Sequence, residues 1–291
     1  MHPITVRDLL RPVAYGAFGS VLVLMIAEVS SLVWITQGIA VAICLLAVLA
    51  GSRQRSALSR LALPLAVAAT ALLAAPLLIH AQTPARWLTT GPVRLYLAPL
   101  VLPLILLTVQ HGLAFQLPKE KQFALTLGGV LIILSLQPDL AQVLAFSVTA
   151  IWTGWRHGLS RVRLVALAMM AVLTASIAAA KPDLLSPVPH VEEVFALGFR
   201  YSVLSGLGIT GTALALLIAI WRIPGENLRG IALYYLTLML VSLSGITPVP
   251  MMGYGASPWL GLALALGLAG SFPSQPMQLN PLSPDDHAPK A

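Results

Sequence analysis

Residues 246–257 read ITPVPMMGYGAS and lie between two apolar runs, residues 230–246 and 258–272. Two prolines and two glycines in this segment disfavour a continuous helix. At membrane depth, non-helical backbone is stable only where protein or a water-filled cavity satisfies its N–H and C=O groups. We therefore predict that the segment lines or closes a cavity.

The composition indicates a membrane protein. Hydrophobic residues make up 58% of the 291 residues, charged residues make up 9%, and the mean hydropathy is +0.88. These values exclude a soluble domain. The formal net charge of +7 is explained by the Lys and Arg residues that membrane proteins concentrate on the cytoplasmic side. We therefore expect a membrane lipid environment and no nucleic-acid partner.

The chain offers few residues for covalent or metal chemistry. Cys44 is the single cysteine, so no intrachain disulfide can form. Metal-ligand spacings are absent from the sequence, so no residue is assigned to a metal. The cofactor is left unknown, and a divalent metal stays open without a motif for it.

Apolar runs recur along the chain at intervals suited to membrane-spanning helices, which need about 20 residues each. They predict an all-α polytopic membrane protein of about ten transmembrane helices, in a single domain over residues 1–272. Residues 273–291 are rich in Pro, Ser and Asp and predict a disordered cytoplasmic tail. The eighth run is long enough to tilt or bend. The runs are residues 13–29, 31–50, 61–79, 95–112, 122–138, 140–155, 164–180, 191–221, 230–246 and 258–272.

Basic residues alternate between rich and poor connecting segments. With a cytoplasmic N-terminus, only Arg86, Arg94, Lys181 and Arg200 of the 17 Lys and Arg residues lie outside cytoplasmic segments. The positive-inside rule then predicts that both termini are cytoplasmic. The unusual polar residues gather on the opposite, outer face, in residues 80–94, 137–139, 181–193 and 246–257.

Four short motifs in these outer segments carry a family resemblance, in family order. They are Arg86, Trp87, Gly91 and Pro92; Gln137, Pro138, Asp139 and Leu140; His190, Glu192, Phe195 and Ala196; and Pro250, Tyr254, Gly255 and Ser257. Together they resemble the SEDS family of bacterial cell-division and cell-shape proteins, typified by FtsW, RodA and SpoVE. The resemblance implies a SEDS-like bundle in the bacterial inner (cytoplasmic) membrane and a role in peptidoglycan biosynthesis.

The resemblance also implies a chemistry. Lipid II, an undecaprenyl-linked sugar precursor, donates its glycan to an acceptor hydroxyl. Such a transfer needs a carboxylate that deprotonates or orients the hydroxyl and cations that stabilise the departing pyrophosphate. Asp183 is the candidate catalytic residue of such a peptidoglycan glycosyltransferase. The candidate substrate-binding residues are Arg86, Trp87, Gln137, Asp139, His190, Glu192, Arg200, Pro250, Tyr254, Gly255 and Ser257.

Several of these residues also have a structural interpretation. Asp139 suits the N-terminal cap of a helix, and Glu192 suits a helix dipole. Arg86 and Trp87 together are typical of an interfacial anchor. Arg200 lies in an apolar run, so it is expected to face a cavity or a carboxylate partner.

The chain departs from the family at polar positions. Tyr96, Leu97, Ala98 and Pro99 stand where the family has Q-P-S-E, and the loop at residues 181–193 is much shorter than the family's. Three interpretations follow. The protein is a divergent SEDS lipid II polymerase working with a single-pass penicillin-binding protein, a non-catalytic relative that binds the precursor or scaffolds a division complex, or a flippase or carrier of lipid-linked substrates.

Overall fold

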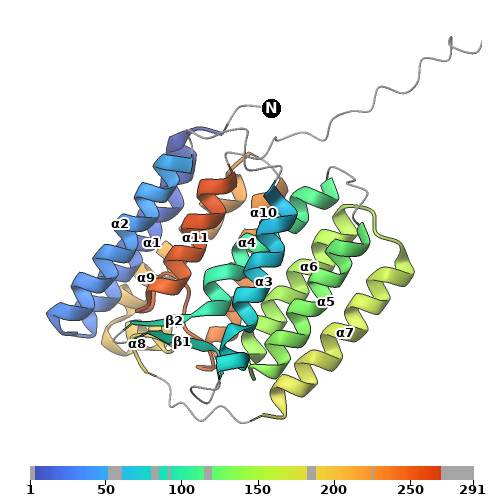
Figure 1. Ribbon diagram of the computed structural model, residues 1–291. Helices are drawn as coiled ribbons and strands as arrows, with labels where there is room; N and C mark the ends of the chain where they lie inside the picture. Colours follow the sequence, from blue (N-terminus) through green and yellow to red (C-terminus); the bar gives the residue numbers. More distant parts are fainter. Residues whose placement is uncertain are drawn as a thin grey trace, which may run out of the picture.

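The structure is a computed structural model that describes residues 4–51, 61–79, 85–90, 93–114, 120–181, 188–224 and 226–269. Within these residues, eleven helices and one short β-hairpin form a bundle (Figure 1). The elements are α1 (Val6–Ile26), α2 (Ser31–Gly51), α3 (Ala62–Ile79), β1 (Trp87–Thr90), β2 (Val93–Tyr96), α4 (Leu97–Ala114), α5 (Glu120–Leu136), α6 (Leu140–Arg156), α7 (Arg161–Ala179), α8 (Val194–Tyr201), α9 (Val203–Arg222), α10 (Glu226–Ser242) and α11 (Ala256–Ala269). The predicted helical membrane fold is confirmed.

The helices follow the apolar runs because a helix satisfies every internal backbone hydrogen bond without water. By length and composition, α1, α2, α7 and α9 are long and apolar enough to cross a membrane, and α3, α4, α5 and α11 contain shorter apolar stretches. The number of spans and the cytoplasmic termini stay predictions. The predicted tail at residues 273–291 lies outside the described residues.

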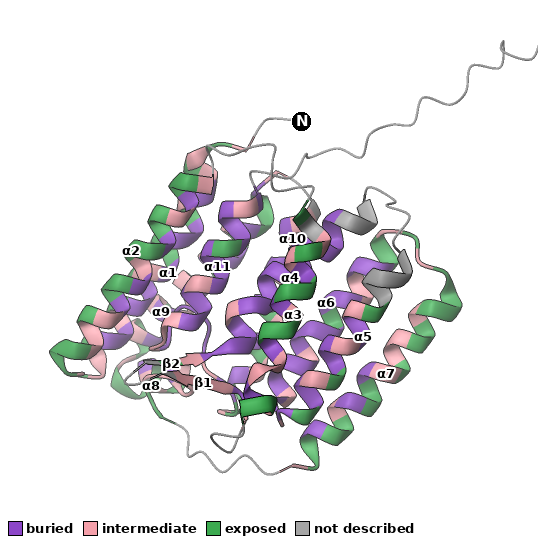
Figure 2. Cartoon of the chain, in the orientation of Figure 1, coloured by how far each residue is buried: buried purple, intermediate pink, exposed green. Residues whose placement is uncertain are grey.

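Helix α4 forms the centre of the bundle. Its residues from Val101 to Val109 are all buried, since α3, α6, α10 and α11 pack around it. Helices α2 and α7 lie at opposite edges and carry much of the exposed surface (Figure 2). Large apolar side chains are exposed on both, including Leu46 and Val162. Such faces are stable against lipid tails, which are as apolar as the side chains themselves.

The long eighth run bends sharply, as its length predicted. Ser202 has extended backbone, with φ −164° and ψ 155°, and separates α8 from α9. Its hydroxyl accepts a hydrogen bond from the Ser205 backbone N–H at 3.0 Å, which caps α9. The two helices touch closely, because a Cβ on Gly198 would lie 3.2 Å from the Cα of Gly206. The short helix α8 lies at the same end of the bundle as the β-hairpin (Figure 1).

The two ends of the bundle differ in charge. Helices α1 and α2 run antiparallel, and the C-terminal turn of α2 meets that of α11, where Gly51 touches the backbone of Gly267. Helix α1 therefore begins, and α11 ends, at the same end of the bundle (Figure 1). That end carries Arg7, Arg11, Arg156, Arg161, Arg163, Arg222 and Arg229, whereas Arg86, Arg94, Lys181 and Arg200 lie at the other. We call the second end the outer end, following the sequence prediction.

Candidate functional site

The β-hairpin at the outer end was not predicted, and it places Arg86 and Trp87 against the bundle. Trp87 pairs with Tyr96 across the two strands, and their rings stack with centroids 5.0 Å apart. The Arg86 guanidinium carbon lies 5.7 Å from the Tyr96 ring centroid, in cation–π geometry. Arg86 is buried, so it is part of the packed interior rather than an exposed anchor.

Tyr96 connects this hairpin to the QPD motif. Its hydroxyl donates to Asp139 Oδ2 at 2.6 Å, and both residues are buried. The other carboxylate oxygen of Asp139 accepts from the Gln142 backbone N–H at 3.4 Å, so Asp139 caps α6 as predicted. Tyr234 on α10 donates to Gln142 Oε1 at 2.6 Å and extends the network. The structure thus brings Arg86, Trp87 and Asp139 together around a tyrosine.

Gln137 lies in the same motif but points elsewhere. Its side-chain amide donates to the backbone carbonyl of Leu73, and the residue is fully buried. This bond ties the end of α5 to α3. The structure therefore separates Gln137 from Asp139, and Gln137 is placed as a contact between helices rather than on an open surface.

Residues 246–257 comprise most of the connection between α10 and α11 and the first two residues of α11, and several of their backbone N–H groups donate to protein acceptors. That the segment lines or closes a cavity stays a prediction. The Val249 N–H donates to the Val191 carbonyl at 2.9 Å, and the Tyr254 N–H donates to the His190 carbonyl at 3.0 Å. Pro250, Met251 and Met252 are buried. The ring centroids of His190 and Tyr254 are 6.4 Å apart. Burial of His190 lowers the pKa of its imidazole. Two sequence motifs, 190–196 and 250–257, are therefore one structural unit.

Gln37 on α2 holds the glycines of this segment. Its Oε1 accepts from the Gly255 N–H at 3.2 Å, and its Nε2 donates to the Gly253 carbonyl at 3.4 Å and to Ser20 Oγ at 2.9 Å. Gly255 has a backbone φ of +151°, a value that residues other than glycine rarely adopt. A Cβ on Gly253 would lie 2.5 Å from the Val191 carbonyl oxygen, so this close approach also requires glycine.

Ser257 joins the two groups of residues. Its hydroxyl accepts from the Tyr96 backbone N–H at 2.9 Å, at the point where β2 continues into α4. The first turn of α11 therefore holds both the hairpin and the end of the 246–257 segment. Four motifs far apart in the chain converge on the outer end of the bundle.

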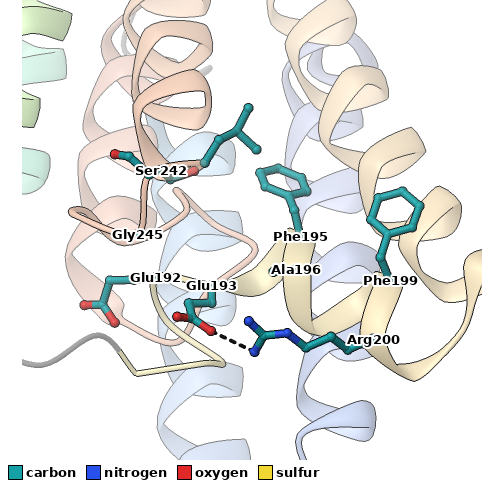
Figure 3. Close-up of a pocket in the computed structure, with 10 residues that line it drawn as sticks. Glu192, Glu193, Phe195, Ala196, Phe199, Arg200, Ser242 and Gly245 are labelled. Carbon is teal, nitrogen blue, oxygen red and sulfur yellow. Dashed lines mark hydrogen bonds and ion pairs between the residues drawn. The ribbon is translucent and has the colours of Figure 1, made fainter.

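A groove of about 420 Å³ lies between α8 and the end of α10, next to residues 190–196 (Figure 3). Arg200 and Glu193 both line the groove and form an ion pair at 3.0 Å. The Arg200 side chain is 67% exposed and that of Glu193 is 31% exposed. Phe195 and Phe199 line the apolar part, and Ser242 and Gly245 line the side belonging to α10. Arg200 therefore has the carboxylate partner and the cavity that its position predicted.

The remaining outer charges have other roles. Glu192 points away from Arg200 (Figure 3), and its Oε2 accepts from the Val188 backbone N–H at 2.7 Å. Lys181 donates to the carbonyls of Ser135 and Leu136, which closes the C-terminus of α5. Asp183, the candidate catalytic residue, lies outside the described residues. Among the described residues, no group of three or more His, Cys, Asp and Glu side chains could hold a metal ion.

Gln37, Tyr234 and the β-hairpin were not predicted from the sequence. Gln37 could have been found, because an amide inside an apolar run is costly unless it is paired. The hairpin had only a weak signal, the aromatic residues Trp87 and Tyr96 on either side of a Gly-Pro pair in the sequence. Tyr234 had no such signal, since a tyrosine in an apolar helix is equally suited to a lipid interface.

Comparison with known proteins identifies the fold. No protein-family model matches the chain, and no curated protein matches it. Among solved structures, the rod shape determining protein RodA of Thermus thermophilus matches with a TM-score of 0.64 and 23% identity, over 92% of this chain and 95% of RodA. The chain has the RodA fold.

Two further structures agree with this RodA match. An aspartate-to-alanine mutant of the same RodA gives a TM-score of 0.63 at 23% identity, over 92% of this chain and 96% of that chain. A chain of a peptidoglycan synthase complex, described as coordinating polymerization and crosslinking, gives 0.61 at 21% identity, over 92% and 97%. The SEDS-like bundle expected from four motifs is therefore confirmed in the fold.

Proposed function

We propose that this protein handles lipid II at the outer face of the bacterial inner membrane, as a SEDS-like protein of cell-wall synthesis in division or cell shape. One observation carries the proposal. The chain has the RodA fold over 92% of its length, and the residues that resemble SEDS motifs converge at one end of that fold beside a groove.

The groove has the two surfaces that such a precursor needs. Arg200 offers a guanidinium for the pyrophosphate, because Arg pairs with phosphate oxygens through two parallel hydrogen bonds. Its present partner is Glu193, and an exposed ion pair of this kind contributes only about 0–1 kcal/mol. A pyrophosphate therefore displaces Glu193 at little cost. Phe195 and Phe199 provide an apolar wall for the polyprenyl chain.

Polymerisation would require one further group. The acceptor hydroxyl attacks the anomeric carbon, the bond to the pyrophosphate breaks, undecaprenyl pyrophosphate leaves, and a carboxylate takes the hydroxyl proton. We assign that carboxylate to Asp183, in the outer segment between α7 and α8. His190 and Tyr254 join residues 188–193 to residues 246–257 through a backbone hydrogen bond, and Gly255 bonds to Gln37, so we assign these three residues a structural role rather than a chemical one.

A non-catalytic role is favoured by a separate observation. Each of the other outer carboxylates in the motif regions already accepts a short bond: Asp139 from Tyr96, Glu192 from the Val188 N–H, and Glu193 from Arg200. A carboxylate held in this way is a poor general base. In this alternative the protein binds the precursor or scaffolds a division complex without forming glycan.

We also propose a partner. A single-pass penicillin-binding protein is expected, because one matching structure is a chain of a peptidoglycan synthase complex. Such a partner would supply crosslinking, whereas this chain would supply the precursor site.

The experiment uses the full chain in lipid nanodiscs with labelled lipid II, with and without a candidate penicillin-binding protein. Arg200→Gln is expected to weaken lipid II binding by about 10- to 150-fold, since a hydrogen bond to a charged group contributes roughly 1.5–3 kcal/mol. Arg94→Gln is the matched control, because Arg94 is an exposed arginine at the same end. Equal losses in both variants would contradict the assignment of the groove.

Product analysis separates the alternatives. Glycan polymer that is lost in Asp183→Ala supports the polymerase, and binding without polymer in any condition supports the non-catalytic role. If lipid II neither binds nor polymerises, both proposals fail, and flipping of lipid-linked substrates in vesicles becomes the next measurement.

A further inference from the structure

A second groove, of about 500 Å³, lies between α1 and α9 at the end of the bundle opposite the outer end. Asp8, Arg11 and Tyr15 line it from α1, at spacings of three and four residues that place them on one helix face. Ala215, Ile218, Ala219 and Arg222 line it from α9 with the same periodicity. The small side chains of Ala215 and Ala219 leave room for the groove, which Arg11 lines from α1 and Arg222 from α9.

The charge of this groove is positive. Asp8 is already engaged, because its Oδ2 accepts from the Thr5 N–H at 3.1 Å and from the Thr5 hydroxyl at 2.6 Å in the cap of α1. Its other oxygen lies 3.5 Å from Arg11, whose side chain is 57% exposed. Arg222 has no hydrogen bond or ion pair with any residue that the structure describes. One carboxylate bound in a cap therefore faces two arginines with donors to spare.

The groove continues into an apolar surface. Tyr15 and Phe18 on α1 and Leu214 and Ile218 on α9 are between 41% and 58% exposed, directly along the two helices from the arginines. A ligand that fits this arrangement carries a negative charge at one end and hydrocarbon at the other. Basic pockets between helices on the cytoplasmic side bind the headgroups of anionic lipids in this way.

We propose that this groove binds one anionic phospholipid, with its phosphate between Arg11 and Arg222 and an acyl chain along Phe18 and Ile218. The lipid bridges α1 and α9. These helices also support the 246–257 segment from behind, since Met252 packs against Gly19 on α1 and lies 3.8 Å from the Thr212 hydroxyl on α9. A lipid bound between α1 and α9 thereby stabilises the two helices against which residues 246–257 pack.

The test measures lipid retention by native mass spectrometry of the full chain, released from nanodiscs of phosphatidylcholine with added phosphatidylglycerol. The double variant Arg11→Gln, Arg222→Gln is expected to bind phosphatidylglycerol about 30-fold more weakly, since each basic residue near a membrane surface contributes about 1 kcal/mol of attraction to anionic lipid. Arg161→Gln is the matched control, because Arg161 is an exposed arginine at the same end, on α7 and away from the groove.

A second variant tests the space rather than the charge. Ala219→Leu fills the groove and leaves both arginines in place, so it is expected to reduce binding of phosphatidylglycerol as well. Unchanged binding in the double variant, or an equal loss in Arg161→Gln, overturns the site. Release of the lipid by millimolar glycerol phosphate would show that the arginines select a soluble phosphate, and this also overturns the lipid assignment. Cooperative unfolding in pure phosphatidylcholine verifies that each variant is folded.

Discussion

The buried hydroxyl of Tyr96 gives the sharpest prediction about the outer end. Tyr96→Phe removes one oxygen and leaves the ring, its stacking on Trp87 and its volume unchanged. The hydroxyl that is lost donates at 2.6 Å to the carboxylate of Asp139, and both residues are almost completely shielded from solvent. A hydrogen bond to a charged group contributes roughly 1.5–3 kcal/mol. We therefore expect about 2 kcal/mol of lost stability, roughly a 30-fold shift in the folded-to-unfolded ratio.

The assay is reversible unfolding in mixed micelles by titration with sodium dodecyl sulfate, followed by tryptophan fluorescence. Tyr201→Phe is the matched control, because it removes the same atom from a side chain that is 67% exposed. That variant is expected to stay within about 0.5 kcal/mol of the wild type, as surface substitutions usually do. The reasoning is refuted if Tyr96→Phe also stays within that range, or if both variants lose the same stability.

Three further predictions concern the segment between α10 and α11. Gly253→Ala places a methyl group 2.5 Å from the Val191 carbonyl oxygen and is expected to lower the free energy of unfolding by about 1–3 kcal/mol in the same titration. Gly211→Ala is the control, because the added methyl group meets nothing within 4 Å; it should be neutral or stabilising by up to about 1 kcal/mol. Gln37→Leu removes the acceptor of the Gly255 N–H, so hydrogen exchange at that amide should accelerate, and unchanged protection would contradict the assigned bond. Burial lowers the pKa of His190 below 6.5, so its contribution to stability is present above that pH and is lost as the pH falls through the lowered pKa. His190→Gln should therefore flatten the acid side of the stability profile, and a profile identical to that of the wild type would exclude His190 as its source.

Much of the fold could be predicted because a single physical demand shapes it. Every apolar run of suitable length became a helix, since hydrocarbon offers no partner for a free N–H or C=O group. The long run at residues 191–221 was expected to tilt or bend, and the bend occurs at Ser202, where the hydroxyl replaces a helical partner. The hairpin at Trp87 and Tyr96 was missed, because four-residue strands give little signal beside long apolar helices.

The candidate site was predictable only in its parts. The four motifs did identify the outer segments that converge, and Asp139 caps α6 as its position beside Pro138 suggested. The partners of those residues were not visible. Arg86 was expected at an interface with Trp87, yet it is buried over the ring of Tyr96. Gln137 and Asp139 are two residues apart in the chain, yet Gln137 bonds to α3 and Asp139 bonds to Tyr96 of β2.

The sequence by itself determined the class of the protein, the position of its helices and the end of the bundle where polar chemistry gathers. Composition and local helix formation depend on neighbours in the chain, so they can be read from it directly. The tertiary structure alone decided that Gln37 holds Gly255 across a separation of 218 residues and that Ser257 accepts from Tyr96 across 161. Those bonds form only because helix packing brings the atoms within about 3 Å, and packing is a property of the whole bundle.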